Sequence, residues 1–206
     1  MGEGVSAEDA MRQLIEGNWR FMNGIPMGPN RTAKRRRELL RGQRPFAAIL
    51  GCSDSRVPPE LIFDLGLGEL FVVRTAGNIP DEGALGSLEY AAEHLGVRLA
   101  VVLGHTGCGA VGAVVQGNRP EGHLEHILNA IRPSVERTKN DPGEGYLNCI
   151  TANIADAVKT VSASPPVLAE LVRQGELKVA GALYHLDSGD VDFLPVEDEG
   201  DAGEPF

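Results

Sequence analysis

The sequence predicts an α/β fold: a mostly parallel central sheet of four strands with an antiparallel edge strand, helices on both faces and an N-terminal helical arm. Short, unbroken apolar runs recur along the chain, as expected of strands that are buried on both faces. Segments with helical spacing separate these runs, and strands that alternate with helices usually form parallel sheets.

Four apolar runs are the expected parallel strands, at residues 45–50, 70–73, 99–103 and 179–186. Helical spacing is found at residues 84–95, 109–116, 124–137, 147–161 and 166–174. A DSGD turn follows the last parallel strand, so residues 191–196 are expected to return antiparallel as the edge strand.

An N-terminal helical arm of residues 1–41 is expected to precede an α/β domain of residues 42–206, the two forming a single domain overall. Ser6 begins a capping pattern, and apolar residues then follow helical spacing. Trp19 belongs to this apolar stripe, which predicts packing either on the chain's own domain or across a second subunit.

Composition and charge narrow the class of partner. The formal net charge is −10, which disfavours nucleic acid because binding phosphates draws on a basic face. The one basic run, residues 34–37, is interpreted as a solvated helix face.

No stretch reaches the roughly 18 apolar residues of a membrane span, and the N-terminus lacks the apolar core of a secretion signal. A cytoplasmic protein is therefore expected, without a membrane partner; a short match at residues 1–6 to the N-myristoylation pattern depends on the host for its meaning.

Polar and reactive side chains cluster directly after the first predicted strand, in the segment GCSDSR at residues 51–56. In open α/β sheets, ligands bind outside the carboxyl ends of the strands. If the chain stays extended there, Cys52, Asp54 and Arg56 project on one side at alternate positions. A thiol, a carboxylate and a guanidinium would then face one cavity.

A second cluster, GHTGCG at residues 104–109, ends the third predicted strand. His105 and Cys108 form an H-x-x-C pair that a tight turn can bring to one metal ion. Three cysteines are also too few and too odd in number for a disulfide framework in a cytoplasmic chain. Together with Cys52, this pair matches the class of catalytic zinc site that keeps a fourth position for water.

Each feature also has a simpler interpretation. A lone cysteine at a strand end is usually a small core residue, and Cys149, within a helical segment, is expected to be one. Residues 107–112 spell the G-x-G-x-x-G of a dinucleotide site, but no acidic residue closes a following strand. His185 interrupts the last apolar run and has no assigned role.

The combination of CSDSR at residues 52–56 and HTGCGA at residues 105–110 resembles the β-class carbonic anhydrases, in their plant-like branch. Similarity continues over most of the chain, at residues 42–45, 68–74, 88–91 and 181–189. The resemblance implies a zinc enzyme that hydrates carbon dioxide reversibly to bicarbonate and a proton by a zinc-hydroxide mechanism.

The resemblance also implies a role for each matching residue. Cys52, His105 and Cys108 would be the zinc ligands, and Asp54 with Arg56 a dyad beside the metal, Asp54 becoming a fourth ligand in a closed state. The positions that match the family's substrate pocket, which lies at a dimer interface, are Gln43, Phe71, Ala76 and Tyr90. A homodimer, or a multiple of dimers such as a homotetramer, is therefore expected.

This sequence departs from the bicarbonate-regulated members of that family. Those members have a Trp three residues before the first zinc cysteine, and Ile49 stands there, although Arg74 and Tyr184 match the other two positions. An open site is therefore expected near pH 7.5. Two other functions stay open at this stage: hydrolysis of carbon disulfide or carbonyl sulfide on the same scaffold, and a non-catalytic module that binds zinc or bicarbonate.

Overall fold

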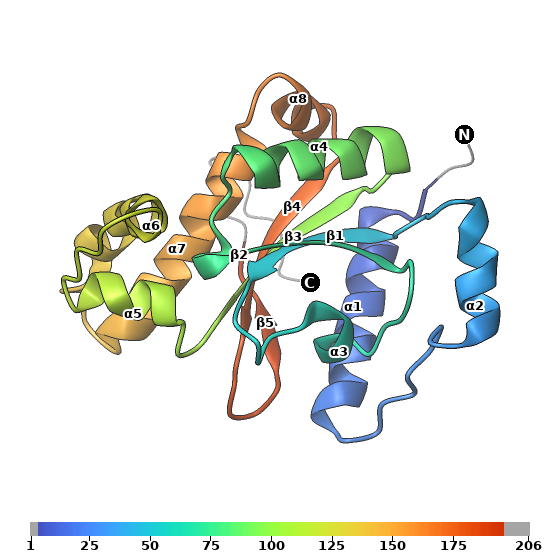
Figure 1. Ribbon diagram of the computed structural model, residues 1–206, viewed down its shortest axis with the longest axis horizontal. Coiled ribbons are helices and arrows are strands. Elements are labelled where there is room, and N and C mark those ends of the chain that lie inside the picture. The colour runs from blue at the N-terminus through green and yellow to red at the C-terminus, as the bar shows by residue number, and fades with distance from the viewer. Residues whose placement is uncertain (1–3, 196–206) are drawn as a thin grey trace.

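The computed structural model describes residues 4–195, which form one five-stranded sheet with helices around it (Figure 1). The strand order is β2-β1-β3-β4-β5. β1 pairs in parallel with β2 and β3, β3 pairs in parallel with β4, and β5 pairs antiparallel with β4. The strands are β1 (Ala47–Cys52), β2 (Leu70–Thr75), β3 (Leu99–His105), β4 (Lys178–Tyr184) and β5 (Val191–Phe193). The predicted fold class is confirmed.

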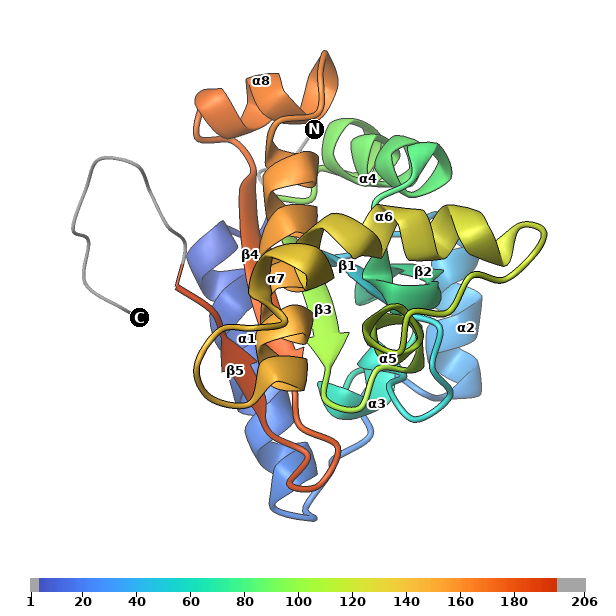
Figure 2. The same cartoon turned by 90° about the vertical axis from the view of Figure 1, so that its left-hand side faces the viewer.

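Helices cover both faces of the sheet: α4 and α7 lie on one face, and α1 and α3 on the other (Figures 1 and 2). The predicted helices are all present, with ends that differ by at most two residues. The α-helices are α1 (Ala7–Met22), α2 (Ala33–Glu38), α3 (Pro59–Ile62), α4 (Glu82–Leu95), α5 (Gly109–Val115), α6 (Leu124–Thr138), α7 (Gly145–Ser162) and α8 (Val167–Arg173). Two short 3-10 turns accompany them, η1 (Leu39–Arg41) and η2 (Ala76–Asn78).

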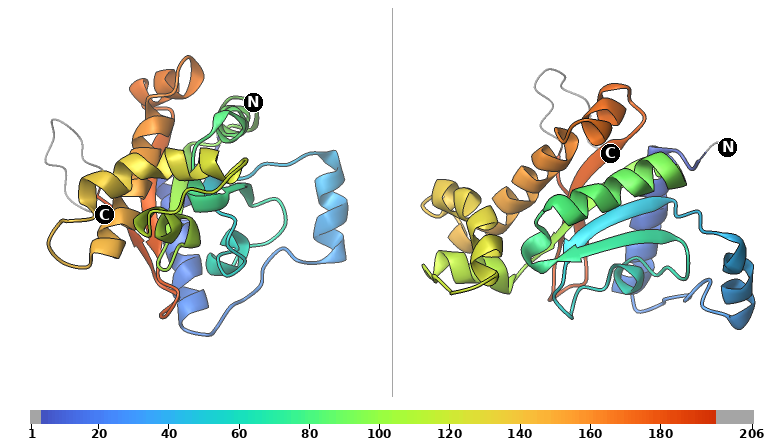
Figure 3. Two further views of the ribbon diagram at one scale, coloured as in Figure 1. Left: turned by 60° about the vertical axis from the view of Figure 1, so that its left-hand side comes forward. Right: turned by 45° about the horizontal axis from the view of Figure 1, so that its top comes forward.

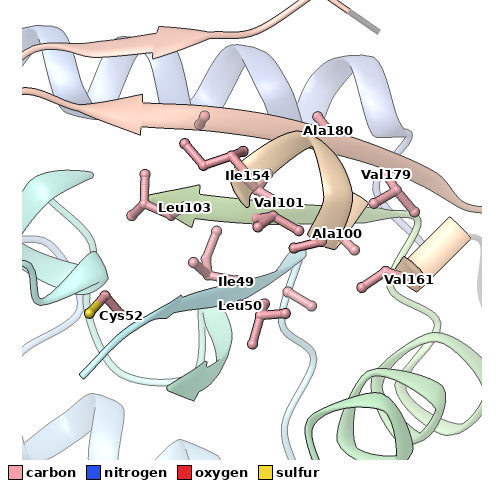
Figure 4. Packing of buried hydrophobic residues seen from close by; sticks show 14 of the residues in the cluster. Ile49, Leu50, Cys52, Ala100, Val101, Leu103, Ile154, Val161, Val179 and Ala180 are labelled. Carbon is pink, nitrogen blue, oxygen red and sulfur yellow. The ribbon is translucent and has the colours of Figure 1, made fainter. Parts of the chain in front are cut away.

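The core lies along the two central strands. Every residue of β1 and β3 is buried, which explains why their sequences are continuous apolar runs without polar alternation. Figure 4 shows Ile154 of α7 packed over β3, close to Leu103 and Val101. The carboxyl ends of both central strands are thus held in a close-packed layer, and the predicted site residues lie at these ends.

The N-terminal helix begins as its capping pattern predicts, because the Ser6 side chain accepts a hydrogen bond from the backbone N–H of Asp9. One side of α1, including Leu14, is buried on the chain's own body, whereas Trp19 on another side is 55% exposed. The following helix, α2, buries none of its residues and stands apart from the sheet (Figure 3). The basic run on α2 therefore lies on a solvated helix, as expected.

The predicted strands differ from the observed ones at their ends. The first runs from residue 47 to 52 instead of 45 to 50, so Cys52 is its last residue. The edge strand ends at Phe193; residue 196, the acidic tail after it and Gly2 lie outside the described residues. Between residues 4 and 195, no helix combines the length and apolar character needed to cross a bilayer.

Candidate metal centre

Three side chains from two neighbouring strand ends meet in one buried group. Cys52 is the last residue of β1, His105 is the last residue of β3, and Cys108 stands at the start of α5. The two sulfur atoms and one imidazole nitrogen lie within 4.8 Å of one another, and all three residues are buried. The convergence predicted for these residues is therefore present, and the donor set could hold a metal ion.

The imidazole of His105 is oriented by its own backbone neighbour. Its Nδ1 lies 2.9 Å from the carbonyl oxygen of Thr106, which accepts the ring N–H. The other nitrogen, Nε2, is buried and has no hydrogen-bond partner. A buried polar atom without a partner is unusual and calls for an explanation, and a metal ion beside the two sulfurs would supply it. The residues present therefore fit a metal.

The two cysteine sulfurs influence each other's ionisation. The Cys108 thiol donates a hydrogen bond to the Cys52 sulfur, which lowers the pKa of Cys52 against the opposing effect of burial. The same contact, together with burial, raises the pKa of Cys108. The backbone N–H of Gly77 also donates to the Cys52 sulfur, at 3.3 Å. The lowered pKa favours the thiolate form of Cys52, and the thiolate is the form of cysteine that binds metals.

Asp54 and Arg56 lie beside this group, but the chain does not stay extended to reach them as expected. It turns at Asp54, whose carbonyl accepts the N–H of Val57 and whose carboxylate accepts the N–H of Arg56. This turn lets the Arg56 guanidinium fold back onto the Asp54 carboxylate, at 2.9 and 2.7 Å. These hydrogen bonds hold the pKa of Asp54 well below its ordinary value, so the carboxylate is ionised at neutral pH.

The carboxylate of Asp54 faces the metal group, because its Oδ2 lies 3.9 Å from Nε2 of His105. Two arginines hold the surrounding loops. Arg74 donates from Nε to the carbonyl of Cys52 at 2.8 Å and from Nη2 to the carbonyl of Asp54 at 2.6 Å. Arg56 also donates to the carbonyl of Gly107, at 3.3 Å. The two loops that carry the group are thus joined to each other and to β2.

The residues that match the family's substrate pocket lie at two separate locations within one chain. Ala76 directly follows β2, whose last residue, Thr75, pairs with Cys52. Phe71 pairs with Ala48 near the opposite end of the strands, so the four residues to Thr75 place it about 13 Å away along the strand. Tyr90 stays with Phe71, their ring centroids 6.1 Å apart.

Gln43 also lies far from the metal group, near Phe71 and Tyr90, because it precedes β1 whereas Cys52 is the last residue of that strand. Of the four pocket residues of one chain, only Ala76 therefore lies next to the metal group. Gln43, Phe71 and Tyr90 lie toward the amino end of the strands.

The structure also accounts for the simpler interpretations. Cys149 is fully buried within α7, as expected of a core residue. The G-x-G-x-x-G segment leads into α5 and then α6, with no strand between them, which rules out the dinucleotide-binding arrangement there. His185 pairs with Asp192 across the β4–β5 hairpin, at 2.9 Å from its Nε2. None of these residues belongs to the metal group.

Several residues around the group were not found by sequence reasoning. The N–H of Gly77, which donates to a ligand sulfur, and the carbonyl of Thr106 are backbone groups that no side-chain pattern reveals. The sequence associates Arg74 only with bicarbonate regulation, yet its guanidinium donates to the carbonyl of Cys52. An arginine four residues after the start of a predicted strand can have many different partners, so the sequence alone does not predict its hydrogen bond to the carbonyl of Cys52.

Comparisons with known proteins agree with the geometry. The family model described as carbonic anhydrase matches residues 47–191. The chain is 40% identical to carbonic anhydrase 2 of Mycobacterium tuberculosis over 184 residues, covering 87% of this chain and 89% of the relative. It is 37% identical to a carbonic anhydrase of Mycolicibacterium smegmatis, covering 89% of this chain and 91% of the relative.

Solved structures are similar over comparable lengths. A Coccomyxa β-carbonic anhydrase in complex with acetazolamide superposes with a TM-score of 0.71 at 26% identity, covering 88% of this chain and 84% of that one. One of two tetrameric β-carbonic anhydrases from Sordaria macrospora superposes with a TM-score of 0.70 at 27% identity, covering 77% of this chain and 85% of that one.

Proposed function

Because this chain belongs to the β-carbonic anhydrase family and is a carbonic anhydrase, we propose that it hydrates carbon dioxide reversibly with a zinc ion held by Cys52, His105 and Cys108. The observation that supports this best is the buried group of two sulfurs and one nitrogen within 4.8 Å, with an unpartnered imidazole nitrogen among them. Two cysteines and one histidine are a known ligand set of catalytic zinc.

Zinc bound there would lower the pKa of a water molecule from about 15.7 toward about 7, and so supply hydroxide at neutral pH. The protein's own contribution begins with Asp54. Its ionised carboxylate, held by Arg56 on two donors, would accept a hydrogen bond from a reacting water beside the metal and orient that water toward carbon dioxide.

Arg56 has two roles in this proposal. Its paired contacts would keep the Asp54 carboxylate from binding the metal itself, since a bidentate guanidinium fixes both carboxylate oxygens at once. Its third contact, to the carbonyl of Gly107, ties the dyad to the segment that carries Cys108. Asp54 is therefore a hydrogen-bond acceptor beside the metal in this open arrangement, and a fourth ligand only if the pair with Arg56 breaks.

The substrate pocket is completed by a second copy of the chain. Gln43, Phe71 and Tyr90 lie at the far end of β1 and β2, and Tyr90 is 47% exposed. β2 is the parallel edge strand of the sheet, at the side opposite β5, so a partner can approach along it. A homodimer would bring one chain's Phe71 and Tyr90 to the other chain's metal, and the arm of residues 1–41, with its exposed Trp19, would extend this contact.

Two further features belong to the proposal. A tetramer would be a pair of such dimers, and the similar Sordaria macrospora enzyme is described as tetrameric. We place the enzyme in the cytoplasm, which fits its three unpaired cysteines because thiols stay reduced in that compartment.

Metal analysis and a stopped-flow assay on one preparation test the proposed function. We expect about one zinc per chain and rapid acidification of a pH indicator on mixing with carbon dioxide. Acidification with carbonyl sulfide or carbon disulfide but not with carbon dioxide would show a different hydrolase. Zinc without activity on any of the three would show a binding module.

A further inference from the structure

One helix on the side of the sheet opposite α1 reaches each of the segments that carry the metal group. Helix α7 directs Tyr146, Asn153 and Ile154 at these segments, the last two standing seven and eight residues after Tyr146. These spacings are close to two helical turns, so the three side chains share one face of the helix. Figure 2 shows α7 running alongside β3 and β4, with α5 beside its N-terminal half.

Tyr146 contacts the segment of the second cysteine. Its hydroxyl donates a hydrogen bond to the carbonyl oxygen of Cys108, with 2.5 Å between the two oxygens. The same carbonyl accepts the N–H of Gly112, which is the first helical bond of α5. The tyrosine thus holds the peptide that joins the ligand to its helix, 38 positions away in the sequence.

Asn153 contacts the segment that supports the first cysteine. It is 95% buried, and its side-chain amide donates to the carbonyl of Gly77 at 3.0 Å. Gly77 has a left-handed backbone, with φ of 70°, and its own N–H is the donor to the Cys52 sulfur. The amide therefore holds in place the residue whose N–H is aimed at that thiolate.

Ile154 supports the remaining ligand through packing. It is fully buried against Gly104, the residue before His105, and a Cβ at Gly104 would lie 2.5 Å from two of its carbon atoms. Figure 4 shows this side chain above the end of β3. The segments that carry Cys108 and His105 are thus in direct contact with α7, and the segment of Cys52 is connected to it through Gly77.

We propose that Tyr146 and Asn153 are positioning residues of the metal centre: through Cys108 and through Gly77 they hold the two thiolates at the separation that the metal requires. The inference rests on the proposed function, because it concerns how the same metal is retained. Groups that orient metal ligands typically contribute 10- to 100-fold to metal affinity, and here both come from one helix that bears no ligand.

The test compares release of zinc to an excess of a chromogenic chelator from wild-type protein, Tyr146→Phe and Asn153→Leu. We expect each variant to lose zinc about 10-fold faster than wild type. Two variants on the same helix serve as matched controls. Thr151→Val removes a hydroxyl that bonds only the helix backbone, and Asn148→Leu removes an amide that bonds only the loop at Asp141 and Pro142. Both should release zinc at the wild-type rate.

A spectroscopic measurement separates positioning from a loss of stability. In cobalt-substituted protein, Asn153→Leu should move the thiolate-to-cobalt charge-transfer band to longer wavelength, because a sulfur that loses a hydrogen bond gives up an electron more easily. The band of Asn148→Leu should stay in place. If Asn153→Leu does not fold, Tyr146→Phe still tests the inference, since it removes one oxygen from a ring that is 37% exposed.

The outcomes distinguish this inference from the function on which it rests. Wild-type protein that binds zinc and hydrates carbon dioxide, with both variants releasing zinc at the wild-type rate, would overturn the positioning role alone. Release accelerated equally in the control variants would also overturn it, because the effect would then come from the helix in general. Wild-type protein that holds no zinc would overturn the proposed function and this inference with it.

Discussion

The guanidinium of Arg56 binds the carboxylate of Asp54 through two hydrogen bonds, Nε to Oδ1 at 2.9 Å and Nη2 to Oδ2 at 2.7 Å. Neither residue belongs to the group of Cys52, His105 and Cys108 that could hold the metal, so the pair and the metal should be separable by mutation. Asp54→Ala should keep its zinc and lose about 100-fold or more in carbon dioxide hydration, the usual range for a group that handles a proton in the reaction. Metal content and stopped-flow rates measured together check this, and wild-type rates in the variant would contradict it.

The three cysteines of the chain offer a matched test of the ligands. Cys108 belongs to the metal group, whereas Cys149 is equally buried but lies in α7, outside it. Cys108→Ala should lose bound zinc and activity, because two remaining ligands hold the ion poorly. Cys149→Ala should keep about one zinc per chain and wild-type activity. Stoichiometric zinc in purified Cys108→Ala, by mass spectrometry, would refute the ligand assignment.

Added bicarbonate should not switch this enzyme off. Ile49 is fully buried in β1 and offers no N–H donor from its side chain, and Arg74 already donates to two backbone carbonyls. A missing hydrogen bond to a charged acceptor costs about 1.5–3 kcal/mol, which corresponds to roughly a ten- to hundredfold weaker site. Activity near pH 7.5 should therefore fall smoothly with added bicarbonate, as for product inhibition. A steep, cooperative loss would contradict this, as would a crystal structure at that pH with Asp54 bound to the metal.

Gly17 allows α1 to lie directly against the chain below it. A Cβ at this position would lie 1.9 Å from the carbonyl oxygen of Phe63, so Gly17→Ala forces the helix away and should destabilise the protein by about 1–3 kcal/mol. Gly86 in α4 has open space around its Cβ position. Gly86→Ala should stabilise by about 0.5–1 kcal/mol through helix propensity alone. Thermal unfolding of the two variants should thus shift in opposite directions, and equal shifts would disprove the close approach.

The buried carboxylate of Asp64 should make stability depend on acid pH. It accepts hydrogen bonds from Arg20 and from the N–H groups of Met27 and Gly28. Burial opposes ionisation, but these donors outweigh it, so the pKa of Asp64 lies below its ordinary value. A depressed pKa stabilises the fold above the unfolded value of about 3.9, and this stabilisation is lost as the pH falls through the folded value.

Asp64→Asn tests the direction of this pH dependence of stability. At pH 7 the variant should be less stable by about 3 kcal/mol, the usual cost of breaking a buried ion pair. Below about pH 4 the difference from wild type should shrink, because protonation removes the charge from the wild-type side chain as well. Chemical unfolding at several pH values measures both quantities. A stability difference that stays constant down to pH 2 would show that the charge of Asp64 contributes nothing.

Sequence patterns were sufficient for the sheet and for the convergence of Cys52, His105 and Cys108 in one group. Apolar runs buried on both faces identified β1 and β3, and the carboxyl ends of neighbouring parallel strands necessarily lie together. Cys52 and His105 could therefore be brought to one place from strand positions alone, and Cys108 followed because it stands three residues after His105. The substrate-pocket residues came from resemblance to a family, not from any local pattern.

Only the tertiary structure decided the rest. The turn at Asp54, the register that separates Phe71 from Cys52, and the contact from Tyr146 to Cys108 join groups whose relation no short pattern encodes. Periodicity and capping act over a few residues, so they determine which segments become strands and helices. Contacts between distant segments depend on how those elements pack and in which register they pair, and these are properties of the whole chain.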